Sequence, residues 1–241
     1  NKLGFKTASF YEVSTQEDLI HALDQVGAPS ILKTRRFGYD GKGQLKIESA
    51  SQVENAWKNS SAKDLILEGF VNFSREFSVI GSRSKDGQIS CFDPGENVHK
   101  EGILRTTTVP ANLTVQQKTE AVLMTAKILE SLNYVGVIGI EFFLEKNSLV
   151  INEFAPRVHN SGHWTQNGCT VDQFEQHIRA ITGWQLGNAE RHSDIIMENL
   201  IGDEIYKTNQ LVADGSLALH LYGKADVKPG RKMGHFNRIR N

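Results

Sequence analysis

Apolar side chains recur every three or four positions in STQEDLIHALDQVG, residues 14–27, and this spacing predicts an amphipathic helix. Ser14 and Glu17 have the spacing of a capping box, in which each side chain bonds the backbone at the other residue. Gly27 ends the pattern, as glycine often does just past the last turn of a helix. We expect a short helix that starts after Ser14 and stops before Gly27.

Three other segments predict helices by the same criteria. SQVENAWKN (51–59) repeats the capping-box spacing with Ser51 and Glu54. TVQQKTEAVLMTAKILESL (114–132) is the longest helical pattern, and it opens with a threonine suited to the N-cap. TVDQFEQHIRAITG (170–183) is another capped segment.

Runs of β-branched and aromatic residues between turn residues predict strands. These runs are SILKT (30–34), DLILEGFV (64–71), REFSVIGSRS (75–84), YVGVIGIEFFLE (134–145) and SLVINEF (148–154), and LALHLYGKADVKPGRKMGHF (217–236) predicts a strand, a turn and a basic return strand. The runs 134–145 and 148–154 flank a Lys146-Asn147 turn and predict a hairpin of buried strands. Strands outnumber helices without strict alternation, so we expect an α+β fold rather than a doubly wound parallel sheet.

The charges nearly cancel, which limits the classes of partner. The 241 residues include 27 basic and 28 acidic side chains, for a formal net charge of −1. No global field attracts nucleic acid or an anionic membrane, so an anion site has to be built locally. No apolar run approaches the length of a membrane span. We therefore expect no nucleic-acid partner and no membrane partner.

Cysteine is scarce, and its placement argues against a disulfide framework. Only Cys91 and Cys169 occur, and no CxxC spacing is present. A zinc site or a disulfide scaffold needs more cysteines at closer spacing. The expected location is the reducing cytoplasm.

Two acidic residues interrupt runs that are otherwise apolar. Glu141 lies within VGVIGIEFF and Glu153 within LVINEF, where a buried charge costs several kcal/mol unless it is paired or binds a metal. If the two strands form a hairpin, both carboxylates reach one cation, and Asn152 adds an oxygen. Such oxygen ligands suit Mg²⁺ that bridges nucleotide phosphates. The alternative is a pair of edge-strand glutamates that face water.

Lys33 ends an apolar run directly before the glycine-rich segment FGYDGKGQ, Phe37–Gln44. A lysine beside backbone N–H groups that a ligand can approach closely is typical of phosphate binding. The segment lacks the G-K-[ST] ending of a P-loop, and no helix follows it immediately. On this evidence alone, a surface lysine before a flexible hairpin is the more frequent case.

Two weaker signals lie elsewhere in the chain. LEGFV (67–71), followed by Glu76, would offer acceptors for adenine or ribose, although a lone glutamate there is more often solvated. GKADVKPGRKMGH (223–235) is rich in basic residues that would hold a phosphate, with the bidentate fork of an arginine. It is equally consistent with a solvated basic turn.

These segments, taken together, resemble the ATP-grasp superfamily and, most closely within it, the N5-carboxyaminoimidazole ribonucleotide synthase family. The resemblance rests on LKTRRFGYDGKGQ (32–44), EGFVNFSREFSVI (68–80), NVHKEGILRTT (97–107), YVGVIGIEFF (134–143), NEFAPRVHNSGHWTQNG (152–168) and KPGRKMGH (228–235). The block PRVHNSGHWTQ is its most specific part. Members of the family carry an N-terminal Rossmann-like domain, and the opening NKLGF of this chain fits a start after that domain.

The resemblance implies an ATP-grasp fold with a small, mostly-β C-terminal domain. Residues 1–70 would form the small lid subdomain with the glycine-rich loop. Residues 71–187 would form the large subdomain with the magnesium and bicarbonate sites. Residues 188–241 would form the subdomain that binds the substrate phosphate. The resemblance also implies a homodimer.

The resemblance also implies a role for each candidate residue. ATP would contact the lysine, the loop, the segment before Glu76 and the carboxylates, namely Lys33, Gly38, Tyr39, Asp40, Gly41, Lys42, Gly43, Gln44, Glu68, Gly69, Phe70, Val71, Glu76, His99, Asn152 and Glu153. Mg²⁺ would be held by Glu141 and Glu153.

The remaining residues would bind the other two substrates. Bicarbonate, and the carboxyphosphate made from it, would meet Arg157, His159 and Asn160, and His159 would move a proton between bicarbonate and amine. The substrate 5-aminoimidazole ribonucleotide would meet Tyr39 and Asp40, with its phosphate on Lys224 and Arg231.

The implied activity is ATP- and bicarbonate-dependent carboxylation of 5-aminoimidazole ribonucleotide through carboxyphosphate, a step of purine biosynthesis. The alternatives are another ATP-grasp carboxylase or ligase, such as one that resembles biotin carboxylase, and an ATP-binding module without turnover. The lysine, the loop and the paired glutamates are common to all three. The RVHNSGHW and KPGRKMGH segments favour the first.

Overall fold

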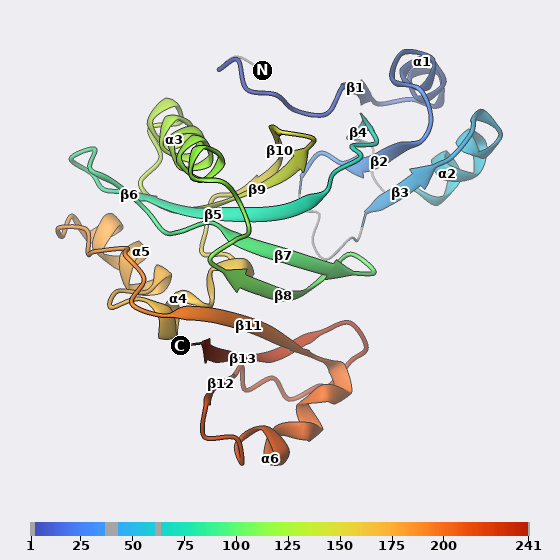
Figure 1. Ribbon diagram of the computed structural model, residues 1–241. Coiled ribbons are helices and arrows are strands. Elements are labelled where there is room, and N and C mark those ends of the chain that lie inside the picture. The colour runs from blue at the N-terminus through green and yellow to red at the C-terminus, as the bar shows by residue number, and fades with distance from the viewer. Residues whose placement is uncertain (1–2, 37–42, 61–63, 241) are drawn as a thin grey trace.

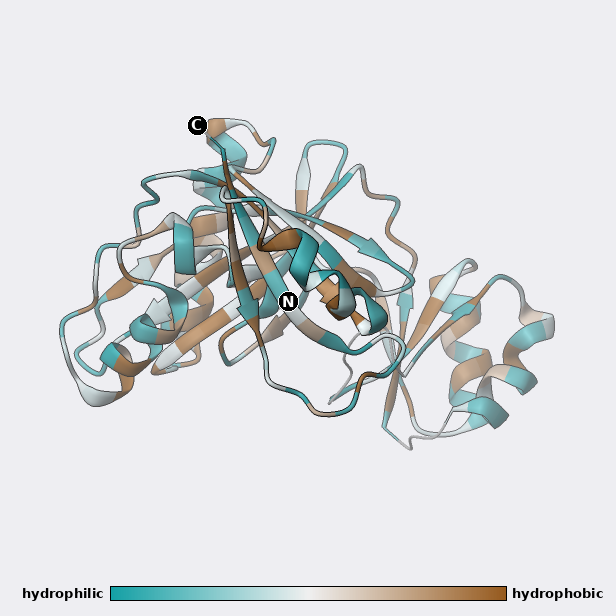
Figure 2. Ribbon diagram, turned by 90° about the horizontal axis from the view of Figure 1, so that it is seen from below, coloured by the Kyte–Doolittle hydropathy of each residue, from teal (hydrophilic) through white to brown (hydrophobic). Residues whose placement is uncertain are grey.

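The computed structural model describes residues 3–36, 43–60 and 64–240. Within these residues the strands form two antiparallel sheets, one of four strands and one of nine (Figure 1). The small sheet and its helices stand beside the larger unit, and they are seen apart from it in Figure 2. This arrangement is the α+β fold that the sequence predicts.

The small sheet has the strand order β1-β4-β2-β3. Its elements are β1 (Phe10–Val13), α1 (Gln16–Val26), β2 (Ser30–Thr34), β3 (Gln44–Ile47), a 3-10 turn (Ala50–Gln52), α2 (Val53–Asn59) and β4 (Leu65–Gly69). Leu19 of α1 packs with Leu32 and Leu67 of the sheet in one apolar core, and all three side chains are buried. This core holds β2 and β4 side by side.

The large sheet has the order β10-β9-β5-β7-β8-β11-β13-β12, and β6 pairs with β5 beside this path. Its strands are β5 (Arg75–Arg83), β6 (Ile89–Cys91), β7 (Gly95–Lys100), β8 (Ile103–Val109), β9 (Gly136–Glu145), β10 (Ser148–Ala155), β11 (Asp194–Ile201), β12 (Leu217–Leu221) and β13 (Lys232–Arg240). The C-terminal strands therefore extend the sheet that begins with β10, because β11 pairs with β8.

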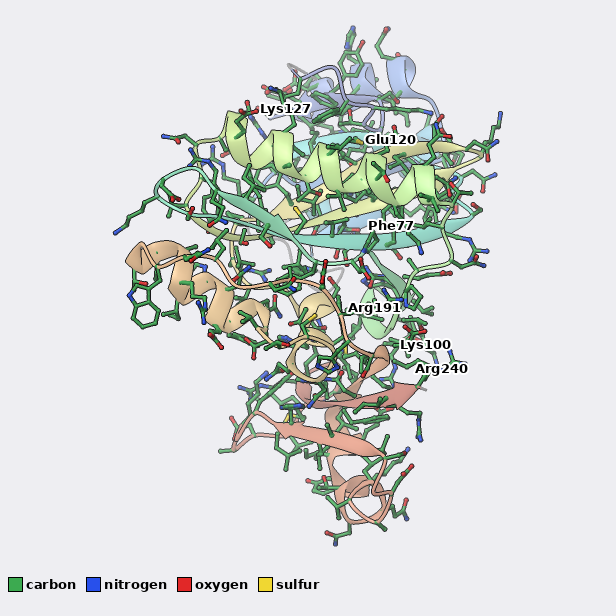
Figure 3. All side chains as sticks on the ribbon, turned by 60° about the vertical axis from the view of Figure 1, so that its left-hand side comes forward. Phe77, Lys100, Glu120, Lys127, Arg191 and Arg240 are labelled. Carbon is green, nitrogen blue, oxygen red and sulfur yellow. The ribbon has the colours of Figure 1, made fainter. Side chains whose placement is uncertain are left out.

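Helices cover both faces of the large sheet. These helices are α3 (Val115–Ser131), α4 (Thr165–Gly168) and α5 (Gln173–Thr182). The short α6 (Thr208–Leu211) follows a 3-10 turn at Gly202–Lys207, and another 3-10 turn lies at Asn160–Gly162. The α3 helix packs on Phe77, Ile140 and Phe142, with Glu120 and Lys127 on the helix and Phe77 on the strand beneath it (Figure 3). Ile80 of β5 and Val137 of β9 belong to a second apolar core, which contains Trp164.

Several predicted elements match the structure. SILKT forms β2 with the predicted bounds, and the longest helix starts at a Thr114 cap whose box is closed by Gln117. The hairpin of β9 and β10 turns at Lys146, which has a positive φ of 57°. The C-terminal segment forms β12 and β13 with the basic turn between them.

The two capping boxes predicted near the N-terminus are wrong. The cap of α1 is Thr15, whose hydroxyl accepts from the Asp18 N–H while the Asp18 carboxylate accepts from the Thr15 N–H. Ser14 lies one residue too early, although its N–H also donates to Asp18. The predicted Ser51 cap falls inside the 3-10 turn, and α2 begins without a side-chain cap bond. Short polar residues in a row leave the capping register open until the backbone turns.

Candidate active site

A cavity of about 640 Å³ lies between the two sheets. The small sheet contributes Lys33, Gln44 and Glu68, and the large unit contributes Glu141 and Asn152 among others. A cavity of this size, walled by apolar strands and a few charged groups, is typical of a cofactor-sized ligand site. Its walls come from segments far apart in the chain.

The hairpin of β9 and β10 brings the two anomalous carboxylates together. Glu153 pairs with Glu141 across the hairpin, and a β-bulge between Ile151 and Glu153 leaves Asn152 without a partner on β9. A bulge re-aims side chains that strict alternation would send to opposite faces. As a result Asn152, Glu141 and Glu153 all line the cavity.

Both carboxylates are harder to ionise than a carboxylate in water, chiefly because they are buried. Burial and the neighbouring charge of Glu153 raise the pKa of Glu141 to about 7, although a hydrogen bond from Asn152 opposes that rise. Burial also raises the pKa of Glu153, although the positive charges of Lys33 and Arg157 oppose this rise. A pair of carboxylates held this way is poised to accept a cation.

The donor set fits magnesium. Across the described ranges, no group of three or more His, Cys, Asp or Glu side chains is arranged to hold a metal ion by itself. Magnesium that works with a nucleotide commonly takes one or two carboxylates from the protein and the rest of its oxygens from phosphates and water. Glu141 and Glu153 meet that requirement, whereas the soft ligands of a zinc site are not present among them.

Lys33 is held at the cavity wall by partners from both sheets. Its Nζ lies 2.7 Å from Glu68 Oε2 and donates to Asn152 Oδ1 at 3.2 Å. Glu68 is thus a partner of the lysine and lines the cavity beside Gly69, Phe70 and Val71. The amide of Asn152 accepts from Lys33 and bonds Glu141, so it links the lysine to the carboxylate pair.

Glu76 and His99 form a second polar pair in the cavity, on the side of the large sheet. Glu76 Oε2 lies 2.8 Å from His99 Nδ1, and both residues line the cavity. Although burial lowers it, the hydrogen bond and charge of Glu76 raise the pKa of His99 above its ordinary value. The pair lies next to the stacked rings of Phe73 and Phe143, whose centroids are 4.3 Å apart. Apolar walls beside hydrogen-bonding groups suit a nucleoside.

Arg157, His159 and Asn160 lie together where β10 ends. Pro156 follows the last strand residue and has no N–H for the ladder. Arg157 uses one N–H to bond the carbonyl of Val158, which leaves further guanidinium donors for a ligand. All three predicted residues line the cavity.

His159 is fixed from several sides. Its Nε2 lies 3.5 Å from Glu141 Oε1, and its Nδ1 is 2.8 Å from Ser161 Oγ. The amide of Gln173 bonds both the N–H and the carbonyl of His159, and a Cβ on Gly139 would lie 2.7 Å from the His159 Cβ. Burial lowers the pKa of His159 to about 3, so the ring is neutral near pH 7.

The structure leaves part of the predicted site outside the cavity. Lys224 donates to the carbonyl of Lys232, and Arg231 donates to the carbonyl of Asp226, and neither of these two predicted phosphate ligands lines the cavity. The basic residue of that turn that does line it is Lys232. The predicted loop residues Gly38, Tyr39, Asp40, Gly41 and Lys42 lie outside the described residues. Gln44 lines the cavity, and Gly43 precedes it with a φ of 79°.

Sequence reasoning missed the residues that support the site. Asn160 and Asn199 exchange two amide hydrogen bonds, of 2.9 and 2.8 Å, and Asn199 also donates to the carbonyl of Leu104. Asn199 lies on β11, which no predicted strand included. The N-terminal residues Thr7 and Ala8 also line the cavity, because Thr7 bridges to Ile151 of β10. No local sequence signal marks these residues.

The two-sheet architecture, with a lysine from the small sheet facing paired glutamates from the large one, defines an ATP-grasp domain. Residues 1–174 match the family model described as the ATP-grasp domain. Residues 196–241 match the model described as the phosphoribosylaminoimidazole carboxylase C-terminal domain.

The chain belongs to the N5-carboxyaminoimidazole ribonucleotide synthase family. It is 51% identical to the N5-carboxyaminoimidazole ribonucleotide synthase of Brucella melitensis, over all of this chain and 67% of that protein. An ADP complex of an N5-carboxyaminoimidazole ribonucleotide synthetase is similar, with a TM-score of 0.94 and 39% identity over 99% of this chain and 64% of the other. The Aspergillus clavatus enzyme in complex with ADP and 5-aminoimidazole ribonucleotide has a TM-score of 0.89 and 30% identity, over 99% of this chain and 65% of the other. This chain thus spans about two thirds of the length of these relatives.

Of the helices that the structure describes, none combines the length and the apolar composition of a membrane span. Cys91 and Cys169 are both free thiols, and burial raises the pKa of each to about 12. Neither cysteine lines the cavity.

Proposed function

We propose that this chain carries the catalytic centre for ATP- and bicarbonate-dependent carboxylation of 5-aminoimidazole ribonucleotide to N5-carboxyaminoimidazole ribonucleotide, a step of purine biosynthesis. The observation that carries the proposal is a single cavity that joins Lys33 and the Glu141–Glu153 pair to Arg157, His159 and Asn160. The first group suits a nucleotide triphosphate with Mg²⁺, and the second suits a small planar anion. The relatives named for this reaction support it.

In the first proposed step a bicarbonate oxygen attacks the γ-phosphorus of ATP, and the bond to the bridging oxygen breaks to release ADP. Phosphoryl transfer of this kind depends on positioning and on neutralised charge. Lys33 would hold the phosphates, and Arg157 would orient bicarbonate through its remaining N–H groups. Magnesium, held by Glu141 and Glu153, would neutralise phosphate charge.

In the second step the exocyclic amine of the substrate forms the new C–N bond, after or during release of CO₂ from carboxyphosphate. The phosphate leaves with the electrons of the broken C–O bond, and the amine loses a proton. Carboxyphosphate hydrolyses readily, so exclusion of water while it exists is part of the proposal. Glu68, Glu76 and His99 would bind the adenosine part of the nucleotide, with Phe70 and Val71 beside it.

Several parts of the proposal rest on the resemblance to the family. We propose that the loop residues 38–44 close over the phosphates, that Tyr39 and Asp40 meet the aminoimidazole ring, and that Lys224 and Arg231 hold its ribose phosphate. The division into units 1–70, 71–187 and 188–241, homodimerisation and a cytoplasmic location belong to the same proposal. Sedimentation velocity of the purified protein tests the homodimer.

The function is tested by ADP release in the presence of ATP, Mg²⁺ and bicarbonate, with and without 5-aminoimidazole ribonucleotide. We expect ADP release that requires bicarbonate, rises with the aminoimidazole substrate, and matches the formation of carboxylated product. Stimulation by an unrelated acceptor alone would assign the chain to another ATP-grasp reaction. ATP binding without ADP release under every condition would instead indicate a binding module.

A further inference from the structure

A row of buried polar side chains leads from the middle of the large sheet to His159. Thr107 lies on β8, Asn97 on β7 and Ser78 on β5, and Ser161 lies in the 3-10 turn after β10. Their exposed fractions are 0%, 4%, 2% and 1%. Buried polar groups are costly unless they are hydrogen-bonded, so a row of this kind requires complete pairing.

The hydrogen bonds of the row run in one direction. Thr107 Oγ1 donates to Asn97 Oδ1 at 2.9 Å, and Asn97 Nδ2 donates to Ser78 Oγ at 3.1 Å. Ser78 Oγ then donates to Ser161 Oγ at 2.6 Å. A serine has one O–H donor, so Ser161, which accepts from Ser78, directs its own proton to the remaining partner. That partner is His159 Nδ1, at 2.8 Å.

The direction of the row decides which ring nitrogen carries the proton. If Nδ1 accepts from Ser161, the neutral ring bears its proton on Nε2. That Nε2 lies 3.5 Å from Glu141 Oε1, and both residues line the cavity. A donor aimed at this edge suits an anionic oxygen of bicarbonate or carboxyphosphate. The orientation of the Asn97 amide is what sets the direction, because its exchange of O and N would reverse every bond in the row.

We propose that Asn97, Ser78 and Ser161 are positioning residues that fix His159 as the Nε2–H tautomer, so that the ring serves as a hydrogen-bond donor to the bicarbonate-derived anion. This inference rests on the proposed function for the identity of the anion, and on the hydrogen bonds alone for the tautomer. It replaces the proton-transfer role that the sequence suggested for His159. The backbone of His159 is held independently by Gln173, so the row controls the ring rather than the turn.

The tautomer is measured directly by long-range ¹H–¹⁵N correlation spectra of protein labelled at histidine, with His159 assigned by its loss in His159→Gln. We expect the wild-type ring to show a protonated Nε2 and an unprotonated Nδ1. In Ser161→Ala we expect a mixture of tautomers, and in Ser161→Thr, which restores the hydroxyl, the wild-type pattern. A wild-type ring protonated on Nδ1 would overturn the proposal without any variant.

The kinetic test uses a matched control on the same strand. Ser82→Ala removes a buried hydroxyl of β5 that bonds the carbonyl of Ser90 and lies outside the row. We expect Ser161→Ala to lower kcat/KM for bicarbonate by at least about 10-fold, because small misplacements of a positioned group are costly, and to leave the KM for ATP within about 2-fold, as in Ser82→Ala. Equal bicarbonate kinetics in the two variants would contradict the positioning role.

The two proposals fail in different ways. If wild-type protein shows no bicarbonate-dependent ADP release, the proposed function fails, while the tautomer spectrum still tests the row. If the wild type is active but Ser161→Ala matches Ser82→Ala in spectrum and kinetics, only the positioning role fails. If Ser161→Ala does not fold, Ser78→Ala provides the second variant, because it removes the donor to Ser161 and leaves the His159 contact in place.

Discussion

Lys33 has a charged partner before any ligand arrives. Its ammonium lies against Glu68 on one side and Asn152 on the other, so the side chain is already directed into the cavity. A lysine that had to be ordered by the ligand would lose rotamer entropy on binding. At the scale of a single residue, the structure thus orients Lys33 for the phosphate contact that we propose.

Replacing Lys33 by methionine should weaken ATP binding by about 10–100-fold, the equivalent of one or two charge-assisted hydrogen bonds. Isothermal titration with ATP and Mg²⁺ measures the effect. Lys58→Met is the control, since Lys58 is an exposed residue of α2 that pairs with Glu54. Equal affinity in both variants would remove Lys33 from the phosphate site.

The anomalous glutamates were visible in the sequence because a charge in an apolar run is costly wherever the run is buried. The residues that support the site through hydrogen bonds could not be recognised in the sequence. Ser78 and Asn199 are ordinary polar residues, and their side-chain bonds arise only when β5 pairs with β7 and β11 pairs with β8. The sequence predicted the basic turn that contains Lys224 and Arg231. The direction of each side chain, which bonds a carbonyl within the turn region, depends on how the turn packs.

At the scale of an element, β10 places two consecutive polar residues, Asn152 and Glu153, on the cavity wall. The bulge inserts Asn152 between the pairs Ile151–Phe142 and Glu153–Glu141. Without that insertion the ladder would be regular, with Glu153 still opposite Glu141. The bulge therefore adds one polar side chain to the cavity wall and shifts the strand register by one residue between Ile151 and Glu153.

Deletion of Asn152 should regularise the ladder and keep the fold, with a stability change of about 1 kcal/mol or less, because no buried apolar contact is lost. Nucleotide affinity should fall by about 10-fold, since Lys33 loses its bond to the amide. Urea denaturation and ATP titration measure the two quantities. Asn152→Ala, which keeps the extra residue but removes the amide, is the control that separates loss of the amide from loss of the bulge. A large loss of stability with unchanged ATP affinity would contradict this account of the bulge.

Element prediction failed in a specific way. The helices and the apolar strands were found because their periodicity is strong. β7 (GENVHK) and β8 (ILRTTTV) carry polar residues at many positions, because one face of each lines the polar row or the cavity. A strand whose inner face is built for hydrogen bonds lacks the apolar alternation by which strands are recognised.

At the scale of the whole molecule, the carboxylate pair costs stability when no cation is bound. The pKa of Glu141 is raised from 4.5 to about 7 in the folded state, so the folded protein binds this proton more tightly than the unfolded chain does. Stability should therefore decrease as the pH rises from about 4.5 to about 7 and stay level above that range. The difference corresponds to about 3 kcal/mol as an upper figure.

Glu141→Gln should remove that part of the pH dependence and raise the free energy of unfolding above pH 7 by up to about 3 kcal/mol, while it lowers ADP release. Urea denaturation in EDTA at pH 5 and pH 8 measures both slopes. Glu130→Gln, which changes an exposed residue of α3, is the control. If wild type and Glu141→Gln lose equal stability between these pH values, the carboxylate pair is not its source.

The C-terminal strands continue the large sheet, and a truncation tests whether they form a separate unit. Ile195 and Met197 of β11 are fully buried in the core that contains Phe92 and Trp164. A protein that ends at Gly187 would expose this core and the edge of β8. We expect aggregation on size-exclusion chromatography and loss of a cooperative thermal transition. A soluble, cooperatively folding 1–187 protein would contradict this expectation and would mean that the large subdomain folds without the C-terminal strands.

The contact between Lys33 and Asn152 joins residues 119 positions apart in the chain. Contacts of such long sequence separation form late, because their loops are costly to close. During refolding, each sheet should gain its strands before the cavity between them is complete. We therefore expect the circular dichroism signal to recover first during refolding and ATP binding to recover after it.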